Sequence, residues 1–231
     1  FQKRKGERPL AAYRNVLPLV DAGHTLHLVA SPLATPDELT AAAVVFVTDA
    51  DDGVLLVHTV SRDAWGAPAG VRERVETVPE CATREVREET GLRIDPSALT
   101  RCGYERVTFD AGPTGRWPHR RNYVACFALV LGDVRPPVAP RDGDVDAAQW
   151  VSWPQAELRC SREFWWPPFV HVARPSALAP GPLSLTLHSS SEVLLAVIPS
   201  GRRTLPASRQ HANTGQGSRS VFHSTLTVSP S

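Results

Sequence analysis

The sequence lacks methionine altogether, and it has no long apolar run and no excess of either charge. The longest apolar run, Val124–Leu131, has eight residues, far short of the ~18–20 that a membrane-spanning helix needs. Basic and acidic residues nearly balance, at a net charge of +1. This balance argues against a strongly basic nucleic-acid binder. We therefore expect a protein without a membrane span and without a nucleic-acid partner.

Cysteine is scarce, and its spacing excludes the common zinc motifs. The four cysteines stand at positions 81, 102, 126 and 160, with no Cys-x-x-Cys pair among them. We expect unpaired thiols, as in a reducing compartment. The charged N-terminus also lacks the clean apolar stretch of a signal peptide. These features together predict a cytoplasmic location.

Composition divides the chain into unequal parts. Residues 173–231 are rich in serine and hold a single aromatic residue, Phe222, which predicts a disordered tail. Within this tail, only Glu192–Ile198 has the pattern of a strand or short helix. Residues 1–39 are expected to form a partly ordered N-terminal extension, either an anion-attracting arm or a solvated terminus. Residues 161–172 hold the run Trp165-Trp166-Pro-Pro and are expected to close over the domain edge by core packing, with base stacking as the other interpretation.

The middle of the chain, residues 40–160, has an α/β pattern. Apolar, valine-rich runs predict strands, and the turn at 49–53 predicts a hairpin between the first two. The expected strands are 41–47, 54–60, 100–109, 122–131 and 148–153, followed by a helix at 154–160. One further helix stands between the second and third of these strands.

This helix has clear start and stop signals. Thr77 and Glu80 form the Thr-x-x-Glu pattern of a capping box, and Pro79 suits a first helical turn. Gly91 is typical of the residue that follows a helix. The pattern predicts a helix over residues 78–90.

Three carboxylates, Glu85, Glu88 and Glu89, share one face of the predicted helix. Like charges at this spacing repel each other, so a partner is expected to offset the repulsion. One interpretation is a hard divalent cation with oxygen ligands, approached by the small-residue loop 67–70. The other is a solvated face on which Arg84 and Arg87 neutralise the glutamates.

The wider spacing favours the first interpretation. The run Gly70-x5-Glu76-x7-Arg84-Glu85-Val86-x-Glu88-Glu89-x-Gly91-Leu92 resembles the complete Nudix box. A Trp-Gly-x-Pro approach at Trp65 and the Gln149–Trp153 strand with its short helix are similar to other parts of a Nudix domain. The resemblance covers about residues 40–160.

The resemblance implies an α+β fold, an α/β/α sandwich with a mixed sheet and a loop–helix–loop motif. It also implies a MutT-like pyrophosphohydrolase that uses Mg²⁺ or Mn²⁺ to cleave a nucleoside diphosphate linked to a group X. The substrate would be a nucleoside triphosphate, an oxidised nucleotide or a nucleotide sugar. The implied catalytic residues are Arg84, Glu85, Glu88 and Glu89, and the implied metal ligands are the three glutamates and the backbone carbonyl of Ala69.

The resemblance implies supporting roles for further residues of the box. Arg84 would orient Glu85, and Glu76 would support the junction between loop and helix or a weaker metal site. Gly70 and Gly91 would be structural. Ala69 and Val75 stand where the family often has glycine, and a positive φ at either position would strain the loop.

Several choices stay open at this point. A Nudix-fold nucleotide sensor without turnover is the alternative function, while a capped-RNA hydrolase would need a basic track that the slightly acidic domain lacks. The expected partner is a small nucleotide, and a homodimer is one option for the oligomeric state.

Two groups of residues outside the box are candidates for the site. An extra carboxylate is expected from Asp142, Asp144 or Asp146, unless this is an ordinary acidic turn, with Asp110 and Glu105 as weaker candidates. Arg116, Trp117 and His119 are candidates for substrate binding, and a solvated hairpin loop is the other interpretation.

Overall fold

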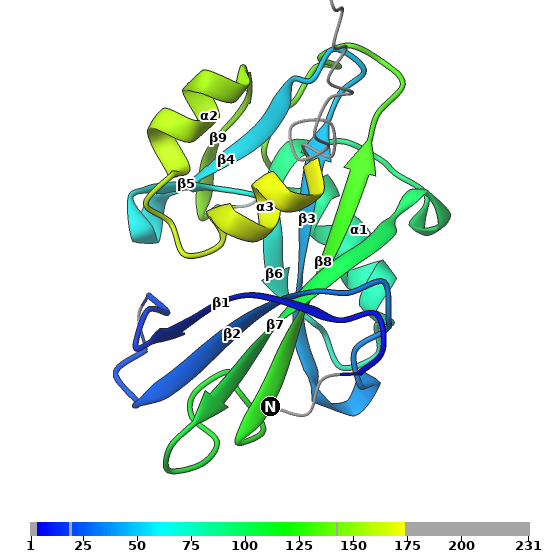
Figure 1. Ribbon diagram of the computed structural model, residues 1–231. Coiled ribbons are helices and arrows are strands. Elements are labelled where there is room, and N and C mark those ends of the chain that lie inside the picture. Colours follow the sequence, from blue (N-terminus) through cyan, green and yellow to red (C-terminus); the bar gives the residue numbers. More distant parts are fainter. Residues whose placement is uncertain (1–3, 19, 142, 174–231) are drawn as a thin grey trace, which may run out of the picture. The chain divides into compact units, whose positions relative to one another are not determined.

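A computed structural model describes residues 4–18, 20–141 and 143–173, which all belong to one compact unit (Figure 1). The predictions for the tail after residue 173 and for Asp142 lie outside these residues. The strands of the unit are β1 (Arg8–Arg14), β2 (His24–Ala30), β3 (Thr40–Thr48), β4 (Val54–Thr59), β5 (Ala64–Gly66), β6 (Ala69–Val71), β7 (Thr100–Phe109), β8 (Arg121–Val130) and β9 (Val145–Val151).

The strands form one mixed sheet in the order β1-β2-β7-β8-β3-β4-β5, with β6 beside β3 and β9 beside β4. Strands β3 and β8 run parallel, and the other pairs are antiparallel. The predicted mixed sheet and α+β class are thus confirmed.

Two of these strands, β1 and β2, lie in the segment before residue 40, for which the sequence predicted no strand. Strand β2 pairs with β7 along its whole length. Strand β1 keeps most of its side chains exposed or half-buried, so it lacks the apolar alternation that marks a strand. Its state depends on pairing with β2 rather than on its own sequence.

The predicted hairpin contains the expected strands but differs in its pairing. Strands β3 and β4 share only the pair Thr48–Val54, because β4 turns away to pair with β5 and β9. The edge of β3 that is left open pairs with β6 over Ala42–Val44. The loop before the charged helix is thereby attached to the central strand.

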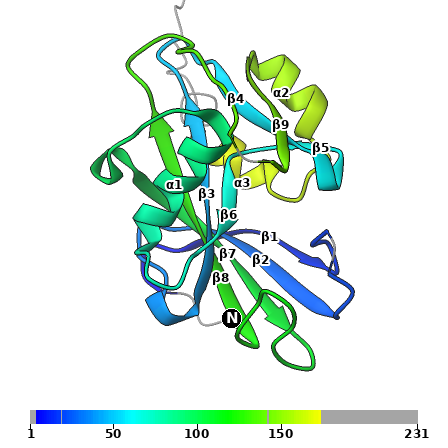
Figure 2. The same ribbon diagram turned by 180° about the vertical axis from the view of Figure 1, so that it is seen from behind.

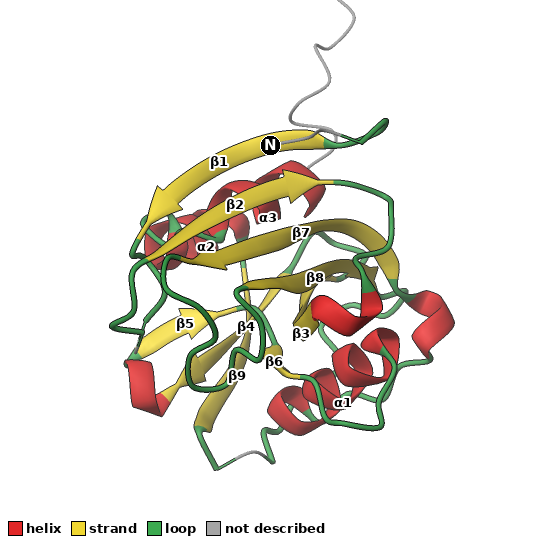
Figure 3. Cartoon of the chain, turned by 90° about the horizontal axis from the view of Figure 1, so that it is seen from below, coloured by secondary structure: helices red, strands yellow, loops and turns green. Residues whose placement is uncertain are grey.

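The helices cover both faces of the sheet around β3 (Figures 1, 2 and 3). Helix α1 (Val78–Thr90) packs on one face, where Val45 and Val47 meet Cys81 and Val86 in one apolar cluster. Helices α2 (Trp153–Cys160) and α3 (Trp166–Ala173) contribute to the cluster on the other face. No helix among the described residues is both long and apolar enough to cross a membrane.

Helix α1 confirms the sequence signals at both ends. Thr77 and Glu80 form the reciprocal capping box, and Gly91 follows the helix with a φ of +77°. Helix α3 was not predicted as a helix, although its two prolines lie in the first turn, where proline is tolerated. The four cysteines are free thiols, as expected.

Candidate active site

The carboxylates of α1 lie directly beneath β6. Glu85 and Glu89 are buried, whereas the side chain of Glu88 is 36% exposed. The carboxylate of Glu85 occupies the space over Gly70, where an added Cβ would come within 2.0 Å of Oε1. Only glycine leaves room for that carboxylate between helix and strand.

Arg84 joins the acidic side chains into one network. Its Nη1 lies 2.8 Å from Oε1 of Glu85 and 2.9 Å from Oε2 of Glu88. Its Nε donates to Oε1 of Glu76, and its Nη2 donates to the Val71 carbonyl at 2.9 Å. A fixed guanidinium fork thus holds three carboxylates and the backbone of β6 together.

The ladder between β3 and β6 directs the backbone of Ala69 toward the glutamates. Val45 and Arg72 donate to Pro68 and Ala41, respectively, so alternate residues of β6 face β3 and the residues between them face away. Ala69 is one of those that face away, and its N–H donates to Oε2 of Glu89 at 2.9 Å. Its carbonyl points to the same side as its N–H.

The loop does not need the strained backbone that was considered for it. Positive φ among the described non-glycine residues occurs at Asn15, Asp52, Asp63 and Arg135, so neither Ala69 nor Val75 adopts it. Val75 is an exposed loop residue. The two departures from glycine therefore impose no left-handed strain on this loop.

Replacing Gly70 by Ala should lower activity by about 100-fold, because the new methyl group displaces the Glu85 carboxylate by an ångström or more. Gly66→Ala is the matched control, since Gly66 lines the same pocket and an added Cβ there meets nothing within 4 Å. Steady-state kinetics on both variants test the expectation. Equal activity of the two variants would show that the position of Glu85 does not matter.

Acid should weaken the network around Glu76. Its hydrogen bond with Arg84 lowers the pKa of Glu76 below the usual 4.5. A carboxyl whose pKa is lower in the folded state contributes stability that is present above its unfolded pKa and is lost as the pH falls through the folded value. We expect the melting temperature of the native chain to fall more steeply below pH 4.5 than that of Glu76→Gln. Parallel pH profiles would contradict this.

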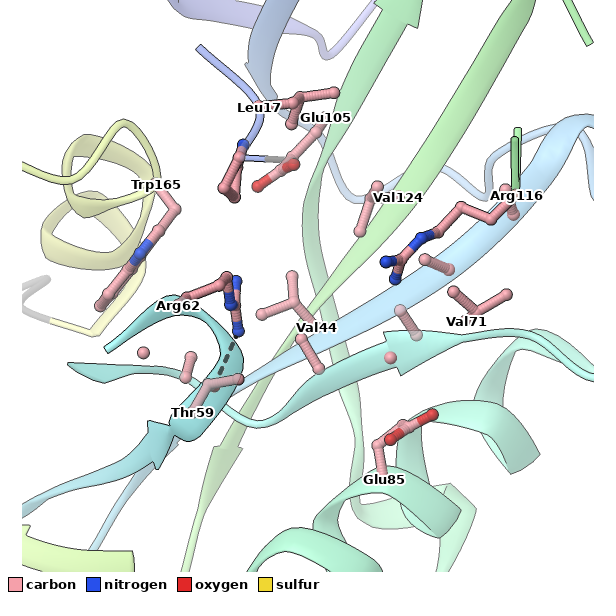
Figure 4. Close-up of a pocket in the computed structure, with 18 of the residues that line it drawn as sticks. Leu17, Val44, Thr59, Arg62, Val71, Glu85, Glu105, Arg116, Val124 and Trp165 are labelled. Atoms are coloured by element: carbon pink, nitrogen blue, oxygen red, sulfur yellow. Dashed lines mark hydrogen bonds between the residues drawn. The ribbon is translucent and has the colours of Figure 1, made fainter. Parts of the chain in front are cut away.

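The carboxylates open into a pocket of about 450 Å³. Arg62 and Arg116 also line this pocket, and both guanidinium groups point into it across from Glu85 (Figure 4). Arg62 Nη2 is fixed by a 2.8 Å hydrogen bond to Thr59 Oγ1. The pocket therefore has an acidic wall and two arginines that face it from opposite sides, so it can hold an anion and a cation together.

The structure brings only one of the described acidic-turn candidates to the pocket. Asp144 lines it, exposed, and accepts hydrogen bonds from the N–H and Oγ of Ser61. These bonds, with Arg62 and Arg116 nearby, lower its pKa. Asp146 instead lies 2.7 Å from Nδ1 of His58, and Asp110 pairs with Arg14.

The loop candidates also separate. Arg116 faces the pocket, while Trp117 is buried against Phe109 in the core and also lines the pocket. His119 does not line the pocket, and its N–H donates to Asn122. The sequence analysis did not assign Arg62 to the site, and it favoured core packing over base stacking for Trp165. Arg62 carries no local signal, because it lies in a single 3₁₀ turn, Val60–Arg62, after β4.

The donor set suits a hard divalent cation. Three carboxylates and a carbonyl directed toward them are the oxygen ligands that Mg²⁺ and Mn²⁺ prefer. Within residues 4–18, 20–141 and 143–173, no three acidic, His or Cys side chains converge closely enough to hold an ion as they stand. The reason is that Arg84 holds Glu85 and Glu88, and the Ala69 amide holds Glu89. The set fits such a cation once these side chains turn.

Comparison with known proteins finds a matching family model and a curated relative. The sequence model of the NUDIX domain matches residues 38–169, more than half of the chain. The chain is also 34% identical over 111 residues to the phosphatase NudJ of Escherichia coli strain K12, an alignment that covers 47% of this chain and 66% of NudJ. The chain therefore spans just under two thirds of that relative's length.

Solved structures show a more distant likeness. The dihydroneopterin triphosphate pyrophosphohydrolase of E. coli is 22% identical, with a TM-score of 0.44, over 59% of this chain and 99% of that one. An Ap4A hydrolase of C. elegans is 16% identical, with a TM-score of 0.45, over 59% of this chain and 96% of its own.

Proposed function

The chain belongs to the Nudix family, and from this premise we propose that it is a metal-dependent hydrolase of a nucleoside diphosphate linked to a group X. The candidate substrates are nucleoside triphosphates, oxidised nucleotides and nucleotide sugars. The observation that carries the proposal is the pocket with box carboxylates on one wall and two arginines that face them from opposite sides. A diphosphate bound there meets charges of both signs.

The acidic wall alone would repel a diphosphate, so we expect a bound cation to neutralise the carboxylates. Glu85, Glu88, Glu89 and the Ala69 carbonyl are the groups that would hold Mg²⁺ or Mn²⁺. Such an ion, when bound, neutralises charge on phosphoryl oxygens and makes a water molecule more acidic. Arg84 keeps Glu85 and Glu88 within reach of each other and of β6.

The remaining residues of the pocket act on the diphosphate and on the proton. Arg62 and Arg116 are placed to bind non-reacting phosphoryl oxygens, which positions the reacting phosphorus. Water forms the new P–O bond, and the bond from that phosphorus to the bridging oxygen breaks. The proton that water loses passes to a solvent-accessible carboxylate of the pocket, for which the half-exposed Glu88 and the exposed Asp144 are the candidates.

A substrate panel tests the proposed function directly. The full chain is incubated with nucleoside triphosphates, an oxidised guanine nucleotide, ADP-ribose and nucleotide sugars, with Mg²⁺, with Mn²⁺ and with a chelator. Anion-exchange chromatography identifies the products, and ¹⁸O-labelled water identifies the attacked phosphorus. We expect hydrolysis of at least one class at the diphosphate bridge, and its loss with the chelator.

Calorimetry on the same panel separates the alternative. Nucleotide binding without turnover of any compound, with either metal, would contradict the proposed hydrolase and favour a nucleotide sensor. Turnover that continues in the chelator would contradict the role given to the glutamates.

A further inference from the structure

One buried carboxyl group of the pocket has no part in the network around Arg84. Glu105, in β7, is 6% exposed and lines the pocket. Among the described residues, no group donates a hydrogen bond to its carboxylate, and burial alone raises its pKa to about 7. A buried carboxyl without a partner costs stability. The presence of Glu105 at this position is explained if a bound ligand donates the hydrogen bond that its carboxylate lacks.

The register of the sheet places Glu105 far from the box. Glu105 pairs with Val124, Val124 with Ala42, and Ala42 with Val71 of β6. Three strand spacings of about 4.8 Å put Glu105 about 14 Å from β6. Figure 4 likewise shows Glu85 and Glu105 at opposite ends of the pocket. Glu105 therefore faces the part of a substrate that lies away from the diphosphate.

The surroundings of Glu105 are mainly apolar and include a flat ring, with Arg62 on the same side of the pocket. Leu17 and Val124 lie beside it, and Trp165 stands on the same side of the pocket (Figure 4). The Trp165 ring is held in place by stacking on Phe46, at 6.4 Å between centroids and 23° between planes. An apolar wall, a fixed aromatic ring and one buried acceptor suit a flat heterocycle with an exocyclic amino group.

We propose that Glu105 is a specificity-determining residue that accepts a hydrogen bond from an amino group of the substrate's nucleobase, bound at the Trp165 end of the pocket. This inference rests on the proposed function, because it takes the diphosphate to lie against α1. It narrows the substrate class to nucleotides whose base carries an amino group: adenine, guanine or cytosine.

The chemistry of the acceptor gives the direction of this preference. An ionised carboxylate has acceptors only, so an amino group satisfies it and an oxo group opposes it. A site built around a buried polar group discriminates strongly against a ligand that leaves the group unpaired. Nucleotide pairs that differ in one exocyclic amino group therefore report on Glu105. In ITP and UTP, an oxo group and a ring N–H replace the amino group and bare ring nitrogen of ATP and CTP, whereas ITP differs from GTP only in a hydrogen that replaces the 2-amino group.

The experiment compares the native chain with Glu105→Leu and Glu105→Gln at pH 8.5. Dissociation constants are measured by calorimetry with Ca²⁺ as the cation, and kcat and KM are measured with Mg²⁺. Glu157→Gln, an exposed carboxylate of α2 outside the pocket, is the matched control. In the native chain and the control, we expect the amino member of at least one pair to bind about 10-fold tighter.

In Glu105→Leu, this ratio should fall to about 1 through the dissociation constant and KM, with kcat largely unchanged. Its melting temperature should rise, because leucine removes an unpaired buried carboxyl. Glu105→Gln, whose amide both donates and accepts, should narrow the ratio and covers the case in which the leucine variant does not fold.

The inference is overturned if both variants change the dissociation constants of all nucleotides by the same factor, or if they leave all of these constants unchanged. It is also overturned if no nucleotide binds, even where another diphosphate compound is hydrolysed, which would leave the proposed function standing. Selective nucleotide binding without any turnover would support the role of Glu105 but contradict the proposed hydrolase activity.

Discussion

Glutamine in place of Glu85, Glu88 or Glu89 should each lower kcat/KM at least about 100-fold, since each change removes a charged oxygen from the proposed cation site. Even substitutions of residues that only support metal ligands typically lower metal affinity or activity by roughly 10–100-fold. Glu88→Gln is the most informative of the three, because the half-exposed Glu88 contributes little to stability. Steady-state kinetics with saturating Mg²⁺ provide the measurement.

The same helix supplies the control for these variants. Glu80 is exposed, undergoes the same substitution, and lies in the capping box, where glutamine serves as well as glutamate. Glu80→Gln should therefore keep full activity and an unchanged melting temperature. If Glu88→Gln and Glu80→Gln were equally active, α1 would be an ordinary charged helix rather than a cation site.

Arg84→Ala should lower the free energy of unfolding by about 3 kcal/mol and abolish activity. The substitution leaves the side chains of Glu76 and Glu85, which are 13% and 7% exposed, without their guanidinium partner. Removing one member of a buried ion pair costs more than the pair itself contributes, because the remaining charge stays buried. Denaturant titrations measure the loss of stability, and kinetics below the melting temperature measure the loss of activity.

Two further variants separate charge from shape. Arg84→Lys keeps a charge but cannot donate in several directions from one plane, so it should be intermediate in both measurements. Arg87→Ala removes a half-exposed arginine with one 3.4 Å contact to Glu88, and it should change stability by less than about 0.5 kcal/mol. A loss in Arg87→Ala as large as in Arg84→Ala would contradict the special position of Arg84.

Local patterns were sufficient to predict the parts of the fold that depend on neighbouring residues. Thr77, Glu80 and Gly91 predicted α1 because capping is a contact between residues three or four positions apart. The same reasoning could not find β1, whose pairing with β2 decides its structure. It also could not show that β6 replaces β4 beside β3, since this depends on competition between distant segments.

The candidate site divides in the same way. The box residues Gly70, Arg84 and Glu85 lie close together in sequence, and the structure places them in contact. Arg62 and Trp165 could not be assigned to the pocket from the sequence, because the turn after β4 and the residue before α3 are brought there only by the folded chain. Glu105 was a weak candidate for an extra carboxylate, and its burial gives it a different proposed role.

The two ends of the pocket are built in different ways, and this has a consequence for how such a protein can change. The wall of box carboxylates, with Arg84 and the Ala69 backbone, comes from one uninterrupted stretch, residues 69–89, that folds on itself. The opposite end is assembled from the loop before β2, from β7 and β8, and from the segment before α3. Substitutions in these separate segments can alter one preference at a time while the reacting groups are inherited intact. In such a protein, substrate specificity can change repeatedly during evolution while the catalytic mechanism is kept.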